Sequence, residues 1–113
     1  MARKGSRRVE VDGIIFDSPQ EADRWLELSA LQDEGVITDL SAHPRWGLIV
    51  NDIRLGRYSS DFLYYCEGNL IVEDNKTRPP QRDFRWQKGL MLALHGITVW
   101  VTGPGGEPKR KKK

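Results

Sequence analysis

The spacing of apolar residues predicts two helices in this chain. A helix is expected over residues 18–34, because a serine N-cap at Ser18, a following proline and Glu21 at the third helical position are typical of a helix start, and Gly35 is a typical stop. A second helix is expected over residues 83–95. The faces expected to be buried are Ala22, Trp25, Leu26, Leu28, Ser29 and Leu31 on the first helix and Phe84, Gln87, Met91 and Leu94 on the second.

Alternating apolar and polar residues outside these helices predict strands. A short hairpin is expected over residues 9–16. Further strands are expected at residues 36–40, 46–50, 57–66, 70–76 and 97–102. The order of elements is typical of the α/β (α+β) class, with a central mixed sheet that contains an antiparallel meander and is flanked by two helices. Trp46, Trp86 and Trp100 are expected to fill the core rather than to stack on nucleic-acid bases.

Composition narrows the chemistry that the chain can perform. Its 113 residues are enough for one domain. A single cysteine, Cys66, excludes an internal disulfide and a multi-cysteine zinc site, and two histidines argue against a histidine-rich metal centre. A metal site would have to consist of oxygen ligands, which favours Mg²⁺ or Mn²⁺. No apolar run approaches the ~18 residues that span a membrane, and no secretory signal is recognisable, so we expect a cytoplasmic protein without a membrane partner.

The basic residues are concentrated at the two ends. Residues 1–8 hold four and residues 109–113 hold five of the 18 Lys and Arg residues, which leaves nine in residues 9–108 against all 16 acids, a net charge of −7 there. We therefore divide the chain into a basic arm (residues 1–8), a globular domain (residues 9–102) and a Gly/Pro- and Lys-rich tail (residues 103–113). Cationic ends favour nucleic acid through counterion release, although a merely solubilising tail has the same composition.

Two of the predicted strands bring acidic residues together. If a two-residue turn at residues 67–68 joins them, Asp61 lies opposite Asp74, with Cβ atoms roughly 4.5–5.5 Å apart, and Lys76 lies on the same face. Two carboxylates this close repel unless a positive charge lies between them. A divalent cation bound to both suits phosphodiester hydrolysis, with Lys76 beside the attacking water. A cross-strand salt bridge from both acids to Lys76 is the alternative, and spacing alone favours it.

Short segments of the chain resemble one known family in order and spacing. They are Val9-Glu10-Val11-Asp12-Gly13, Phe16-Asp17-Ser18, Glu21-Ala22, Asp39-Leu40, Pro44-Arg45, Asp61-Phe62 and Val72-Glu73-Asp74-Asn75-Lys76. Over about residues 8–102 the chain resembles a phage- and prophage-encoded family of small proteins long catalogued as a domain of unknown function. That family is generally placed in the PD-(D/E)xK nuclease superfamily, with restriction enzymes and phage junction-resolving endonucleases.

The resemblance implies a fold and an activity. The fold would have a restriction-endonuclease-like core. The activity would be that of a Mg²⁺- or Mn²⁺-dependent endonuclease acting on DNA, with branched or recombination intermediates as a plausible substrate and a homodimer as the usual assembly. It also implies a phage or prophage origin and a location in the cytoplasm of a bacterial host.

The resemblance also assigns residues to the site. Asp61 matches the first acid of the superfamily, and Asp74-Asn75-Lys76 matches its (D/E)xK triplet. The implied metal ligands are Asp61, Asp74, Glu21 and the backbone carbonyl of Asn75, and Lys76 would position the attacking water. The implied catalytic residues are therefore Asp61, Asp74, Lys76 and Glu21.

Two positions depart from the superfamily pattern, and two acids have competing explanations. Ser60 stands where proline is usual before the first acid, and Thr77 stands where glycine is expected after the triplet. Glu21 is also well placed to close a helix capping box with Ser18, which explains it without any metal. Glu73 should point to the opposite face of its strand from its neighbour, and we expect a surface or salt-bridge residue there rather than a metal ligand.

Basic residues after the triplet and in the tail are expected to contact DNA phosphates. They are Arg78, Arg82, Arg85, Lys88, Lys109, Arg110, Lys111, Lys112 and Lys113. A solvated helix face is the alternative for the four that come first. Two other functions remain open at this point: a non-catalytic nucleic-acid-binding accessory protein of phage recombination or replication, and a structural or regulatory phage protein.

Overall fold

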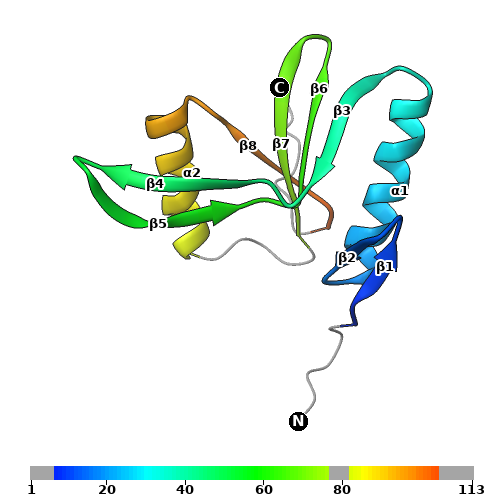
Figure 1. The fold of residues 1–113 in the computed structure, drawn as a ribbon, viewed down its shortest axis with the longest axis horizontal. Coiled ribbons are helices and arrows are strands. Elements are labelled where there is room, and N and C mark those ends of the chain that lie inside the picture. Colours follow the sequence, from blue (N-terminus) through cyan, green and yellow to red (C-terminus); the bar gives the residue numbers. More distant parts are fainter. Residues whose placement is uncertain (1–6, 77–81, 105–113) are drawn as a thin grey trace.

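The computed structural model describes residues 7–76 and 82–104, which form eight strands and two helices. In chain order these are β1 (Val9–Val11), β2 (Ile14–Phe16), α1 (Pro19–Asp33), β3 (Ile37–Ala42), β4 (Arg45–Val50), β5 (Ile53–Ser59), β6 (Phe62–Cys66), β7 (Asn69–Asn75), α2 (Arg82–His95) and β8 (Val99–Thr102). Figure 1 shows α1 and α2 on opposite sides of β6 and β7, while the β4–β5 hairpin extends away on the side of α2.

Four strands form a mixed sheet in the order β3-β6-β7-β8. Strands β7 and β8 are parallel, and the other neighbours are antiparallel. In the described part of the chain, β1–β2 and β4–β5 form separate two-stranded sheets. The predicted α+β architecture, with a mixed sheet and two helices, is confirmed at this level. No helix formed by the described residues is long and apolar enough to cross a membrane.

Helix α1 begins and ends where the sequence predicts. Ser18 is its N-cap, and the Ser18 hydroxyl accepts a hydrogen bond from the backbone N–H of Glu21 at 3.2 Å. Gly35, with φ +82°, follows the end of the helix. The buried residues of the helix are Ala22, Trp25 and Leu28. Leu26 was expected on this face but is 51% exposed. The buried face of α1 is therefore narrower than predicted.

Two hydrophobic cores cover the two faces of the mixed sheet. The core beneath α1 consists of Phe16, Ala22, Trp25, Leu28, Ile37, Phe62 and Tyr64. The core beneath α2 consists of Leu48, Tyr58, Val72, Phe84, Met91 and Val99. Side chains of β6 and β7 are therefore buried on both faces, so any polar side chain in the middle of these strands needs a partner inside the protein.

The single strand predicted over residues 57–66 is wrong, because two strands of different sheets occupy this segment. Strand β5 pairs with β4 and ends at Ser59, whereas β6 begins at Phe62 and pairs with β3 and β7. Ser60 and Asp61 lie between them, where the chain changes from one sheet to the other. The hydroxyl of Ser60 donates to the carbonyl of Phe62 at 3.2 Å, which helps to fix this change of direction.

Two tryptophans expected in the core lie largely in solvent. Trp86 is 52% exposed on α2, and Trp100 is 54% exposed on the edge strand β8. Trp100 points away from the α2 core because its neighbours Val99 and Val101 occupy the opposite face of the strand. Trp46 is half-buried and stacks on Tyr58 with ring centroids 6.1 Å apart, so only this one of the three packs as expected.

Candidate functional site

Asp61 and Asp74 lie side by side where β6 begins and β7 ends. The β6–β7 ladder runs from Cys66–Asn69 to Phe62–Glu73, which confirms the predicted register up to the last pair before Asp61. Beyond it, the Asp61 N–H donates to the Asp74 carboxylate at 3.1 Å, and the Asn75 N–H donates to the Asp61 carboxylate at 2.7 Å. Each carboxylate is thus held by the backbone of the other strand.

Asp74 is buried, and two further side chains approach it. The hydroxyl of Tyr58 donates a hydrogen bond to Asp74 Oδ2. Lys76 Nζ lies 3.8 Å from the same oxygen and 4.6 Å from the centre of the Phe84 ring. The lysine is therefore held between an acid of the sheet and an aromatic ring of α2. Tyr58 was not predicted as a site residue, and its pattern of neighbours in the sequence does not distinguish it from a core tyrosine.

Glu21 reaches the same region from the first turn of α1. Its backbone N–H donates to the Ser18 hydroxyl, which is one of the two hydrogen bonds of the predicted capping box. Its carboxylate oxygen Oε1 is buried and has no hydrogen-bond partner among the described residues. A buried oxygen without a partner is costly, so helix capping does not account for Oε1 of Glu21.

Burial is the main reason that the pKa values of all three acids are raised, and nearby carboxylates add to the effect. Burial, and after it the negative charges of Glu21 and Asp74, raises the pKa of Asp61 to about 7 from an ordinary value of 3.8. The pKa of Glu21 is raised by burial and by the charge of Asp17, and Asp74 adds to this effect. Burial also raises the pKa of Asp74, although the Tyr58 hydrogen bond and the charge of Lys76 oppose it. One lysine therefore does not balance the negative charge gathered here.

Glu73 points to the other face of β7 and is fully compensated. It is 0% exposed and accepts hydrogen bonds from Arg24 Nε at 2.7 Å and Arg24 Nη2 at 3.0 Å. The hydroxyls of Tyr64 and Thr102 also donate to it, each at 2.7 Å. Burial alone would raise the pKa of Glu73, but these hydrogen bonds lower it below its ordinary value. The expected salt bridge exists, but the expected surface position is wrong because α1 covers this face.

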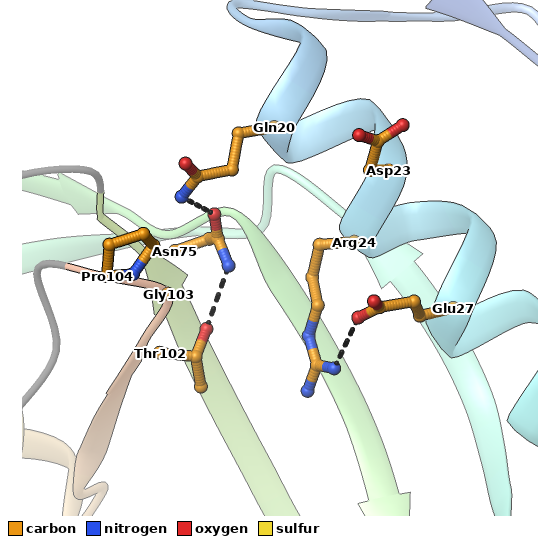
Figure 2. A pocket seen from close by; sticks show the side chains of 8 residues that line it. All are labelled: Gln20, Asp23, Arg24, Glu27, Asn75, Thr102, Gly103 and Pro104. Carbon is orange, nitrogen blue, oxygen red and sulfur yellow. Dashed lines mark hydrogen bonds and ion pairs between the residues drawn. The ribbon is translucent and has the colours of Figure 1, made fainter.

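A pocket of about 260 Å³ lies between α1 and the ends of β7 and β8, and Gln20 and Asn75, the chain neighbours of Glu21 and Asp74, are among its lining residues. Figure 2 shows Gln20 of α1 donating to the Asn75 side chain, which in turn donates to Thr102, at 2.6 and 3.1 Å. Gly103 packs so closely that a Cβ there would lie 2.7 Å from the Lys76 carbonyl oxygen. These contacts hold the backbone of Asn75 and Lys76 in place, and they explain why the chain continues through a glycine beside the site.

The oxygen atoms of these side chains are the kind of ligand that a hard divalent cation prefers, but they are not arranged to bind one in this structure. In residues 7–76 and 82–104, no group of three His, Cys, Asp or Glu side chains is close enough to hold a metal ion. Three of the four carboxylate oxygens of Asp61 and Asp74 accept protein hydrogen bonds. The unpartnered Oε1 of Glu21 and the surplus of carboxylates, however, are what Mg²⁺ or Mn²⁺ would satisfy. Binding would require some of these hydrogen bonds to be exchanged for the ion.

The basic residues expected to contact DNA are placed only in part. Arg85 is exposed on α2 and Lys88 is half-buried there. Arg82 begins α2, but its side chain is outside the described part of the structure, as are Arg78 and the whole of residues 109–113. The expectation that these residues contact nucleic acid stays a prediction.

Comparison with known proteins gives one match. The family model described as "Protein of unknown function (DUF1064)" matches residues 1–95. No curated protein and no solved structure matches the chain.

Proposed function

The chain belongs to the DUF1064 family, and we propose that this member is a metal-dependent endonuclease that hydrolyses DNA phosphodiester bonds. One observation carries the proposal. Asp61 and Asp74 are held against each other by the backbone of two adjacent strands, with Lys76 3.8 Å from Asp74. Glu21 adds a third acid whose buried oxygen has no partner among the described residues.

A purely structural role explains this arrangement poorly. A structural acid in this sheet resembles Glu73, which has an arginine and two hydroxyl groups around it. Asp61, Asp74 and Glu21 have one lysine between them, and burial raises the pKa of each, with the charge of Asp74 adding to the effect on the other two. Clustered, mutually repelling acids are retained mainly where a cation or substrate needs them. The resemblance to the PD-(D/E)xK superfamily, and with it a restriction-endonuclease-like core, is part of the proposal.

The residues divide the work as follows. Asp61, Asp74, Glu21 and the Asn75 carbonyl would hold Mg²⁺ or Mn²⁺, which supplies positive charge to the phosphate in the transition state and makes water a better nucleophile. Lys76 donates hydrogen bonds that orient the attacking water or the phosphate oxygens. Tyr58 and the Asn75 N–H fix the directions of the two aspartates, and the phenyl ring of Phe84 limits where Lys76 can point.

DNA rather than RNA is proposed as the substrate because of the resemblance to the superfamily. Branched or recombination DNA and a homodimeric assembly belong to the same proposal. A second candidate is an accessory protein that binds nucleic acid without cutting it. The observation in its favour is that three of the four oxygens of Asp61 and Asp74 already accept protein hydrogen bonds.

A cleavage assay separates the two candidates. The full-length protein is incubated with supercoiled, linear, single-stranded and four-way-junction DNA in Mg²⁺, Mn²⁺ or EDTA, beside Asp74→Asn and the exposed control Asp33→Asn. We expect metal-dependent cleavage that Asp74→Asn reduces on the order of 100-fold or more, because several kcal/mol of transition-state stabilisation depend on the cation. Asp33→Asn should cut like the wild type.

Two results would count against the nuclease. Intact DNA in every lane, with binding preserved, would favour the accessory protein. Cleavage at full rate by Asp74→Asn would mean that the site lies elsewhere in the molecule.

A further inference from the structure

The β4–β5 hairpin has two very different faces. Its register pairs Arg45 with Ser59, Gly47 with Arg57 and Ile49 with Arg54. Directly opposed residues share a face, and residues two apart on β4 share it as well, so all three arginines lie on one face. The other face carries Trp46, Leu48 and Tyr58, which pack in the core beneath α2. The hairpin is therefore anchored by one face and presents three arginines on the other.

The arginine face is open to solvent. Arg45, Arg54 and Arg57 are all exposed. Within the described part of the chain, none of the three forms an ion pair or a side-chain hydrogen bond. No acidic residue shares this face, since the one acid of the hairpin, Asp52, lies in its turn.

The charge of the hairpin contrasts with that of the region before it. Residues 9–44 contain nine acids and one arginine, a net charge of −8, whereas residues 45–59 contain three arginines and one acid, a net charge of +2. A polyanion that approaches the acidic site is thus repelled on the side of α1 and attracted on the side of the hairpin.

The hairpin starts at the candidate site. The Asp61 carbonyl accepts from the His43 N–H at 2.9 Å, and the Ser60 N–H donates to the Pro44 carbonyl at 3.1 Å, so both ends of the hairpin are tied together beside Asp61. Each pair of residues along a strand advances roughly 6.6 Å. Arg45 is therefore nearest to the site, and Arg57 and Arg54 lie about 7 Å and about 13 Å farther along the hairpin. This is the direction in which β4 and β5 extend in Figure 1.

We propose that the exposed face of β4–β5 binds the phosphate backbone of double-stranded DNA next to the cleavage site, through Arg45, Arg57 and Arg54. The proposal rests on the proposed function for the identity of the polyanion. One guanidinium group can donate two parallel hydrogen bonds to a phosphate. A row of arginines without ion-pair partners on one face of the hairpin matches a polymer of regularly spaced negative charges. The β4–β5 hairpin aligns the duplex, while Asp61 and Asp74 act at the end of the hairpin where β4 begins and β5 ends.

Fluorescence anisotropy in EDTA tests this face without any cleavage. The full-length protein binds a labelled duplex at 50–200 mM salt, beside the triple variants R45Q/R54Q/R57Q and R45K/R54K/R57K. We expect the Gln variant to bind more weakly at every salt concentration, and the slope of log affinity against log salt to decrease by about 2 to 3, since each lost phosphate contact removes about 0.9. The Lys variant should keep the slope of the wild type, because its charge is unchanged. Circular dichroism melting should give all three proteins the same Tm, because the substituted side chains are exposed.

The outcomes distinguish this inference from the nuclease proposal. Wild-type slope and affinity in the Gln variant would overturn it, even if Asp74-dependent cleavage is found, and would leave an acidic protein as the partner of this face. Absence of duplex binding by the wild type would also overturn it. Weakened binding by the Gln variant, together with no cleavage in Mg²⁺ or Mn²⁺, would support DNA binding by the β4–β5 hairpin and reject the nuclease proposal.

Discussion

Glu73 and Asp74 are consecutive residues of β7, and both are buried carboxylates, at 0% and 3% exposure. They differ in what surrounds them. Glu73 faces α1, where Arg24 supplies a paired charge and Tyr64 and Thr102 supply two hydroxyl donors. Asp74 faces the other way: Tyr58 and the Asp61 N–H donate hydrogen bonds to it, Lys76 lies at 3.8 Å, and its charge raises the pKa values of Asp61 and Glu21. Both carboxylates accept hydrogen bonds, but Glu73 is paired with an arginine, whereas Asp74 belongs to a group of three acids beside one lysine.

The difference supports a structural role for Glu73 and a place for Asp74 in the proposed site. When a buried carboxylate is paired with an arginine, removing either partner leaves an isolated buried charge and destabilises the fold. A buried cluster of acids with too little positive charge costs stability, and such a cost is typical of a site kept for binding or chemistry. The same amide substitution in the two environments should therefore have opposite effects.

The largest effect is expected from Glu73→Gln. The substitution leaves Arg24 beside a neutral amide on the closed side of the sheet, and we expect it to lower the free energy of unfolding by about 3–5 kcal/mol at pH 7. The pKa of Glu73 is lowered in the folded protein, so the difference between wild type and variant should be full above its ordinary pKa of 4.5 and shrink as the pH falls through the lowered value. Urea denaturation across this range measures it. A variant as stable as the wild type would show that the ion pair contributes little.

Asp61→Asn should act in the opposite direction. The folded protein holds the Asp61 proton up to a pKa of about 7, whereas the unfolded chain loses it near 3.8, so this group's contribution to stability falls as the pH rises from about 4 to 7. In EDTA at pH 8 the variant should exceed the wild type by as much as about 4 kcal/mol, and the gain should fade toward pH 4. The Asn side chain can still accept from the Asn75 N–H. A destabilised Asp61→Asn at pH 8 would contradict the comparison.

Glu21 and Ser18 provide the smallest but most specific test. Ser18→Ala removes the helix cap and should cost about 1 kcal/mol while leaving cleavage unchanged. Glu21→Gln keeps the backbone N–H that Ser18 accepts, so α1 should stay intact, whereas metal-dependent cleavage should fall at least roughly tenfold if Glu21 is a ligand. Thermal melts and the plasmid assay measure the two effects. Full cleavage by Glu21→Gln would reduce the site to the two aspartates and Lys76.

Local patterns were sufficient to predict most of the elements and part of the proposed site. The cap at Ser18 and the stop at Gly35 locate α1 almost to the residue. A two-residue turn between β6 and β7 fixes the register, and this register brings Asp61 next to Asp74 without any knowledge of the rest of the fold. Such features depend on neighbours in the sequence, and the sequence contains them.

Contacts between distant elements could not be predicted in this way. Arg24 and Glu73 are 49 positions apart, and Tyr58 and Asp74 are 16 apart on strands of different sheets. The alternating run from residue 57 to 66 contains no signal that the chain leaves one sheet at Ser60 and enters another at Phe62. Trp100 is 54% exposed on the edge strand β8, although its run of apolar neighbours predicts a core position. Each of these is decided by packing, which a linear pattern does not record.

The binding of Mn²⁺ tests the central claim most directly, because it asks whether the surplus acids hold a cation independently of any substrate. Mn²⁺ is titrated into the wild type, Asp74→Asn and the control Asp33→Asn at pH 8, and the free ion is followed by electron paramagnetic resonance. We predict that the wild type and Asp33→Asn bind Mn²⁺ alike and that Asp74→Asn binds it at least roughly tenfold more weakly. Equal affinity in all three proteins, or no binding by the wild type, would contradict a cation site built on Asp61, Asp74 and Glu21.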